Sequence, residues 1–228
     1  FENYNYQNIT LSGNFKNPLF DGLLVIDDPN LNFEFKGLVD ISEELNRFDF
    51  NAKIEFAELK QLNIVKRDSI SIFAGKVDME MIGNDLNTLF GAISFKETFY
   101  QNEIDNFYFN DFKITSYRED LKRIIKINSP DIITGSIVGE FLIEEIPSLF
   151  INGIGSVYTN FKPLKISKNQ FLDFDFKIYN KLIEIFIPDL QFGENTRIKG
   201  TVFSNDSKLK LDFDSPEIIL FKNYLGNV

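Results

Sequence analysis

A two-residue alternation of apolar and polar side chains is the feature that most restricts what this chain can fold into. In the clearest example, Phe48, Phe50, Ala52, Ile54 and Phe56 alternate with polar residues. Alternation with this period puts the apolar side chains on one face of a β-strand. One apolar face and one polar face are typical of strands in an antiparallel sheet.

The same pattern recurs at 31–40, 93–99, 172–179 and 208–214. Turn-favouring residues separate these segments, and their spacing predicts about 13 to 16 strands. No linker or change in composition divides the chain. We therefore expect residues 1–228 to form one continuous β segment, and the start at Phe1 rather than Met suggests a piece of a longer parent protein.

Some segments depart from a regular alternation. We expect one or two helical turns at 83–90 and a helix at 144–158, with Pro147 near its start. Two strands change phase, one at Gly75 and one across Asn110 and Asp111. Such a change is typical of a β-bulge, and bulges bend sheets, so we expect a curved sheet.

The composition argues against several functional classes. The chain has no Cys and no His, so it cannot form a disulfide, a zinc–thiolate site or a Ser-His-Asp triad. It has 34 acidic and 24 basic residues, a formal net charge of −10, which argues against binding a nucleic-acid backbone. We expect no enzyme activity, no cofactor, no metal and no nucleic-acid partner.

Paired carboxylates are the remaining candidates for hydrolytic or calcium chemistry. They occur at 27–28, 43–44 and at positions 173 and 175. Asp173 and Asp175 lie two residues apart, on the polar face of a predicted strand, and Asp27 and Asp28 lie at a predicted turn. We interpret them as solvated side chains and predict no catalytic residue.

The apolar faces need a partner, since Phe alone occurs 26 times. In a β-sandwich, two sheets cover each other's apolar faces. In the other arrangement, a single curled sheet leaves its apolar interior to a lipid. The alternation alone favours the sandwich and does not exclude the curled sheet.

Several segments resemble the TamB (translocation and assembly module) family of the AsmA-like superfamily, in its Bacteroidota form. The most specific block runs from Leu-Phe-Asp-Gly at position 19 to Gly-Leu-Val-Asp at position 37. The matching segments are 19–31, 35–42, 48–50, 57–64, 135–149, 183–190 and 195–200.

This resemblance implies an all-β fold: a long curved antiparallel sheet curled into a β-taco, a repeating groove with an apolar interior, and one or two short helices. It implies a periplasmic segment whose parent is anchored in the inner membrane. The family is associated with conducting phospholipids between the inner and outer membranes. It is also associated with assembling outer-membrane β-barrels beside a TamA-type barrel partner, which is the alternative function.

On this interpretation, the partners are phospholipid acyl chains and, through the parent, the TamA-type barrel. Apolarity and strand phase together select the residues that we expect to line the groove. They are Phe20, Leu24, Ile26, Phe33, Phe35, Phe48, Phe50, Ile54, Phe95, Phe174, Phe176, Leu211 and Phe213.

Overall fold

The structure is a computed structural model of the chain. It describes residues 3–16, 18–41, 44–66, 68–103, 105–156, 160, 162–179, 190–220 and 223–226. The resemblance segment at 183–189, the carboxylate Glu43 and the predicted helix end at 157–158 lie outside the described residues.

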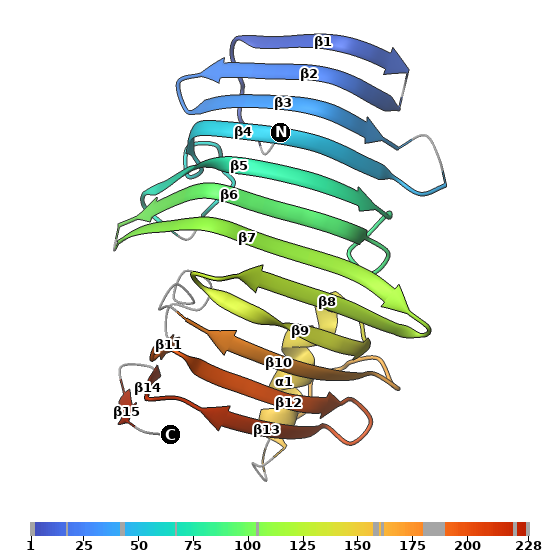
Figure 1. Ribbon diagram of the computed structural model, residues 1–228, viewed down its shortest axis with the longest axis vertical. Helices are drawn as coiled ribbons and strands as arrows, with labels where there is room; N and C mark the ends of the chain where they lie inside the picture. Colours follow the sequence, from blue (N-terminus) through green and yellow to red (C-terminus); the bar gives the residue numbers. More distant parts are fainter. Residues whose placement is uncertain are drawn as a thin grey trace. The chain divides into compact units, whose positions relative to one another are not determined.

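The described residues form fifteen strands and two short helical elements, and the fold is all-β as predicted (Figure 1). The strands are β1 Ile9–Lys16, β2 Leu19–Asp28, β3 Leu31–Asp40, β4 Arg47–Glu58, β5 Ser71–Ile82, β6 Phe90–Asn102, β7 Asn106–Glu119, β8 Lys122–Ser129, β9 Ile133–Glu140, β10 Phe171–Ile178, β11 Leu190–Phe192, β12 Thr196–Phe203, β13 Lys208–Asp214, β14 Glu217–Leu220 and β15 Asn223–Gly226.

Twelve of these strands form one long antiparallel sheet, in the order β1-β2-β3-β4-β5-β6-β7-β8-β9-β10-β12-β13. Strands β11, β14 and β15 form a small separate sheet. Each strand of the long sheet is hydrogen-bonded to the next strand of that sheet along the chain, so consecutive segments become spatial neighbours. The chain therefore builds the single long sheet, and the described residues do not divide into the two facing sheets of a sandwich.

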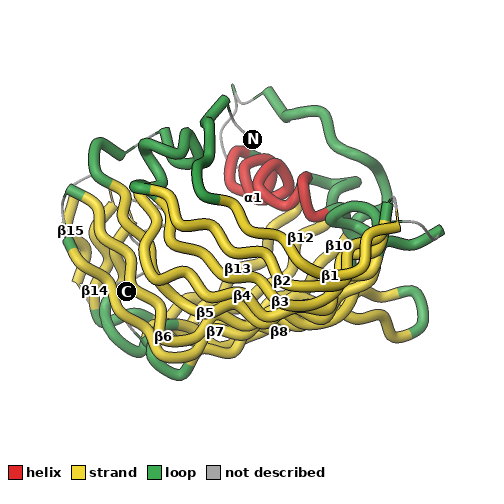
Figure 2. Tube along the Cα trace, turned by 90° about the horizontal axis from the view of Figure 1, so that it is seen from above, coloured by secondary structure: helices red, strands yellow, loops and turns green. Residues whose placement is uncertain are grey.

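The chain divides into two compact units. Unit 1 comprises Phe1–Asn84 and Gly91–Lys113, and unit 2 comprises Asp85–Phe90 and Ile114–Val228. In each unit the strands are bowed along their length (Figure 2). That the chain acts as one segment of a longer parent remains a prediction.

Both segments predicted to be helical contain helical backbone hydrogen bonds, but only one of them forms a helix of more than one turn. A 3₁₀ turn, η1 (Ile143–Glu145), leads into helix α1 (Ile146–Gly155), with Pro147 in its first turn, where a missing N–H costs nothing. At 83–90 the structure has a single helical turn, at the lower end of the prediction, because the carbonyl oxygen of Asp85 accepts hydrogen bonds from the backbone N–H groups of Thr88 and Leu89. Asp85 Oδ1 accepts hydrogen bonds from the backbone N–H groups of Asn87 and Thr88, which closes the turn locally.

The irregularity predicted within β5 lies instead on its partner β4. The register runs regularly to Ile54 opposite Gly75 and resumes at Ala57 opposite Phe73, so β4 carries the extra residue. As a result Ala57 is buried, whereas Phe56, predicted on the apolar face, is exposed. A Cβ at position 75 would lie 3.0 Å from the Thr98 hydroxyl oxygen, so a larger residue there would require Thr98 to shift.

Strand β6 changes phase where the sequence shows none. Glu97 has a φ of +48°, which interrupts the alternation. Beyond it Thr98 and Tyr100 are buried, so the prediction that Phe99 shares a face with Phe95 is wrong. The phase change predicted in β7 is confirmed, because Asn110 and Asp111 are both exposed and the rings of Phe109 and Phe112 lie 6.0 Å apart.

Candidate functional site

The strand register of unit 1 gathers the apolar side chains of β1 to β5 on one face. Residues directly opposite each other in antiparallel strands point to the same side of the sheet. The register thus defines four rows of five residues that cross the strands. The rows are Ile9, Ile26, Phe33, Ile54 and Gly75; Leu11, Leu24, Phe35, Ala52 and Val77; Gly13, Gly22, Gly37, Phe50 and Met79; and Phe15, Phe20, Val39, Phe48 and Met81.

All twenty positions of these rows, which we call the unit 1 apolar face, carry an apolar side chain or glycine. The face brings together eight of the predicted groove residues, those from Phe20 to Ile54. Phe95, on β6, contacts Phe112 at a ring distance of 6.4 Å. The prediction missed β1, although its alternation of Ile9, Leu11 and Phe15 with polar residues is readable in the sequence.

Four phenylalanine rings form a chain of contacts on this face, next to a row of glycines. The ring centroids of Phe15 and Phe20 lie 4.9 Å apart, those of Phe20 and Phe35 5.8 Å, and those of Phe35 and Phe50 4.8 Å. The Phe20 ring leans over Gly22, since a Cβ on Gly22 would approach Cε2 of Phe20 to 3.0 Å. Ring-over-glycine packing gives a continuous aromatic surface without polar atoms.

Protein covers this face only in part. Both helical elements of the described chain belong to unit 2, so no described helix lies in unit 1. At β1, Ile9 is 54% exposed, Leu11 46% and Phe15 56%, whereas Ile26 and Phe35 farther in are buried by their neighbours. The β1 ends of the rows thus present apolar area to whatever surrounds the molecule.

A polar cluster closes one end of the unit 1 apolar face. The Asp28 carboxylate accepts hydrogen bonds from the Tyr4 hydroxyl at 2.6 Å and from the backbone N–H of Gln7 at 2.8 Å and of Asn30 at 2.9 Å. Burial of the carboxyl raises the pKa of Asp28, but these hydrogen bonds lower it more, and the net pKa lies below its usual range.

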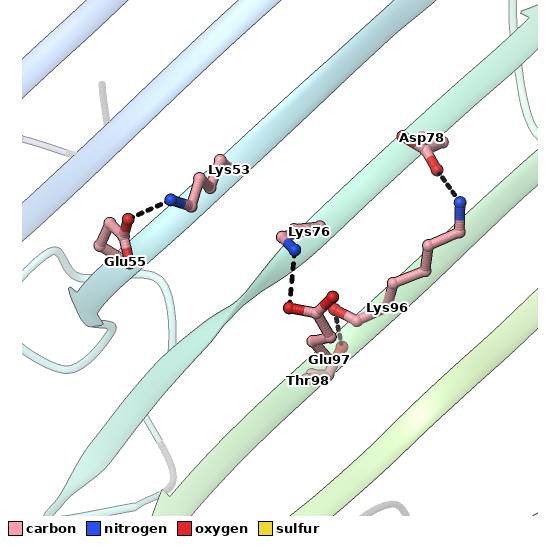
Figure 3. A network of polar contacts seen from close by, with 7 residues as sticks. All are labelled: Lys53, Glu55, Lys76, Asp78, Lys96, Glu97 and Thr98. Carbon is pink, nitrogen blue, oxygen red and sulfur yellow. Dashed lines mark hydrogen bonds and ion pairs between the residues drawn. The ribbon is translucent and has the colours of Figure 1, made fainter.

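The opposite face of unit 1 is charged. Figure 3 shows ion pairs between Lys53 and Glu55, between Lys76 and Glu97, and between Lys96 and Asp78. The hydrogen bond from Lys96 is the largest cause that holds the pKa of Asp78 below its usual range. Because these side chains are well exposed, each pair contributes little to stability. These charged side chains keep the opposite face of unit 1 solvated.

Unit 2 repeats the arrangement with three rows across β8, β9, β10, β12 and β13. The rows are Arg123, Gly139, Leu172, Val202 and Leu209; Ile125, Ile137, Phe174, Gly200 and Leu211; and Ile127, Gly135, Phe176, Ile198 and Phe213. The four remaining predicted groove residues, Phe174, Phe176, Leu211 and Phe213, lie on this face.

Helix α1 covers part of the unit 2 face (Figure 2). Leu149 of the helix is 1% exposed and packs with Leu172, Phe174 and Val202 in the core of the unit. The ring of Phe150 meets that of Phe174 edge to face at 5.1 Å. Phe174 is therefore a core residue, whereas Leu211, on the same row, is 51% exposed.

A buried cation anchors the turn at 85–90. Arg123, 4% exposed, donates hydrogen bonds to the carbonyl oxygens of Leu86 and Leu89 and to the Ser116 hydroxyl, and its guanidinium lies 5.0 Å from the centre of the Phe90 ring. Burial lowers the pKa of Arg123. These acceptors occupy the guanidinium, so Arg123 is a structural residue.

The carboxylates singled out in the sequence do not gather into a reaction centre. Asp175 pairs with Arg197 at 2.7 Å, and Asp173 accepts a hydrogen bond from Thr201, both on the exposed face of unit 2. Among the described residues, no group of three or more acidic side chains is placed to hold a metal ion. Neither helical element of the described chain has the length and apolarity needed to span a bilayer.

No protein-family model matches the chain, and no curated protein or solved structure shows significant similarity to it.

Proposed function

We propose that this chain is a segment of a bridge-like lipid transfer protein, and that phospholipid acyl chains bind along the unit 1 apolar face. The observation that carries the proposal is the set of four uninterrupted apolar rows in unit 1, a unit that contains no described helix. On this proposal the parent spans the periplasm and supports outer-membrane biogenesis. The resemblance of segments such as 19–31 to the TamB family supports that setting.

The physical character of the face suits a sliding ligand. Each methylene moved from water onto an apolar surface gains about 0.8 kcal/mol, with no preferred direction. The four rows carry no hydrogen-bonding side chain, so an acyl chain gains nearly the same free energy at each position and meets only small barriers to translation. The charged residues of the opposite face, such as Lys96 and Asp78, confine the lipid to one side.

The unit 2 face can take part only where α1 leaves it open. Phe174 lies beneath the helix, whereas Leu211 at the edge strand is exposed. We therefore expect lipid contact in unit 2 at the exposed positions and little contact at Phe174.

Leu23 and Leu24 provide a matched test of the proposal. They are adjacent in β2 and similarly half-buried, but Leu24 lies on the apolar face whereas Leu23, opposite Lys36, lies on the other face. The purified protein would be incubated with phospholipid vesicles that contain a photoactivatable acyl chain, and the cross-linked lipid would be quantified and mapped by peptide mass spectrometry.

We expect cross-links on the unit 1 apolar face, and we expect Leu24→Asp to remove most of them because it puts a charge in the path of the acyl chain. The Leu23→Asp variant should label like the wild type. Equal labelling of the two variants, or cross-links spread over both faces, would count against the proposal.

A further inference from the structure

Helix α1 carries apolar side chains on its exposed side as well as on its buried side. Leu149 and Gly153 are buried within unit 2, whereas Ile151 is 47% exposed and Ile154 54%. Pro147 is also exposed and lies about one turn before Ile151, so these three exposed residues share one side of the helix, which we call the outer face of α1. A surface helix normally has polar residues on such a face. The outer face of α1 is thus a candidate binding surface for an apolar partner.

Hydrogen bonds hold residues 164–167 along one flank of α1. The buried Asn152 side chain donates to the carbonyl oxygen of Leu164 at 2.9 Å and accepts from its N–H at 2.7 Å. About two turns earlier, the Glu145 carboxylate accepts hydrogen bonds from the N–H of Ser167 at 2.7 Å and from its hydroxyl at 3.0 Å. The segment therefore runs antiparallel to the helix and leaves it only by breaking four hydrogen bonds.

The charge of this segment is opposite in sign to the net charge of the chain. Lys162, Lys165 and Lys168 are exposed, and they are the only charged residues in the stretch 146–172 of a chain whose net charge is −10. None of the three forms an ion pair within the part of the chain that the structure describes, unlike the lysines of Figure 3. These uncompensated positive charges favour an anionic partner.

A cavity of about 470 Å³ lies between this segment and the β12–β13 turn, and its lining includes Lys165, Lys168 and Ser207. Ammonium and hydroxyl groups are donors that phosphate oxygens accept. The cavity therefore suits a phosphate-bearing group better than a purely apolar one.

We propose that the outer face of α1 and Lys162, Lys165 and Lys168 bind the surface of an anionic phospholipid bilayer. Apolar side chains that enter the acyl boundary, together with lysines that contact head groups, are the combination by which peripheral helices bind such membranes. A helix with its side chains is only about 10–12 Å across, so a bilayer that covers the outer face also comes within reach of lysines on the flank. The outer face has no hydrogen-bonding side chain, and acyl chains need none.

This inference concerns unit 2 alone and does not depend on acyl chains binding the unit 1 apolar face. Binding would be measured by co-sedimentation of the purified protein with vesicles of phosphatidylcholine, alone or mixed with phosphatidylglycerol. We expect the wild type to bind the mixed vesicles more tightly. The Leu24→Asp variant, which tests the proposed function, should bind them like the wild type, so failure of one proposal is distinguished from failure of the other.

Matched variants test the two parts of the surface separately. Lys165→Ala should weaken binding to the mixed vesicles about fivefold, whereas Lys113→Ala, which removes an exposed lysine of unit 1, should change it less than about twofold. Ile154→Ser should weaken binding about five- to tenfold because less apolar area enters the bilayer. Leu121→Ser, at a turn residue that is 73% exposed, should have little effect. Circular dichroism would establish that each variant is folded.

Two results would overturn the proposal. One is a wild-type chain that does not bind the mixed vesicles, or binds both kinds of vesicle equally, as it would if an acidic protein were the partner of this surface. The other is a folded Lys165→Ala or Ile154→Ser variant that binds the mixed vesicles as tightly as its matched control.

Discussion

Replacing Phe174 with alanine tests whether the apolar face of unit 2 is a true protein core. Phe174 is 6% exposed, lies opposite Ile137 and Gly200, and meets the ring of Phe150 at 5.1 Å. Full burial of a phenylalanine is worth about 1.5–3 kcal/mol, and the edge-to-face ring pair adds about 0.5–1.5 kcal/mol. With the cavity that is left behind, we expect the free energy of unfolding to fall by about 3–5 kcal/mol.

Leu211→Ala is the matched control, because Leu211 lies on the same row, opposite Gly200, but is 51% exposed. We expect it to cost less than about 1 kcal/mol. Urea unfolding would be followed by far-ultraviolet circular dichroism and by tyrosine fluorescence, since the chain has no Trp. A loss below 1 kcal/mol for Phe174→Ala, or equal losses for the two variants, would refute the packing of α1 against Phe174.

Three further variants test the polar anchors. Arg123→Met should lower the free energy of unfolding by about 2–4 kcal/mol in urea titrations, because it leaves two carbonyl groups and the Ser116 hydroxyl without their donor; wild-type stability would contradict this role. Asn152→Ala should cost about 1–3 kcal/mol and speed hydrogen exchange at the amide of Leu164, which donates to the buried Asn152 side chain. Because hydrogen bonds lower the folded pKa of Asp28, its stabilisation is fully present above the unfolded pKa of about 3.9 and is lost as the pH falls through the folded pKa. The stability difference between wild type and Asp28→Asn should therefore be large at pH 7 and shrink below pH 4 in thermal unfolding; a constant difference would refute it.

The strand phases were predictable from the sequence because they follow from local alternation. The phases of 31–40, 172–178 and 208–214 all agree with the observed register. The helix at 146–155 was also predictable, since Pro147 marks its first turn. The glycines gave a weaker signal: they are visible as interruptions of strands, but their place next to the phenylalanine rings depends on cross-strand register.

Local irregularities and long-range packing were not predictable in this way. The extra residue in β4 and the positive φ of Glu97 are set by neighbouring strands, so alternation alone misplaced Phe56 and Phe99. The sequence predicted the helix, but nothing local indicated that it would dock over Phe174. The turn at 85–88 has helix-like composition, yet Asp85 closes it before a second turn can form.

Native mass spectrometry of the purified protein tests the central claim most directly. If acyl chains bind the unit 1 apolar face, the wild-type chain should carry phospholipid through purification, released on activation as intact lipid masses. Phe50→Asp, which puts a charge in the glycine row, should then be recovered folded and largely free of lipid. A wild-type chain without bound phospholipid, or a Phe50→Asp variant that differs from it only in stability, would contradict the account.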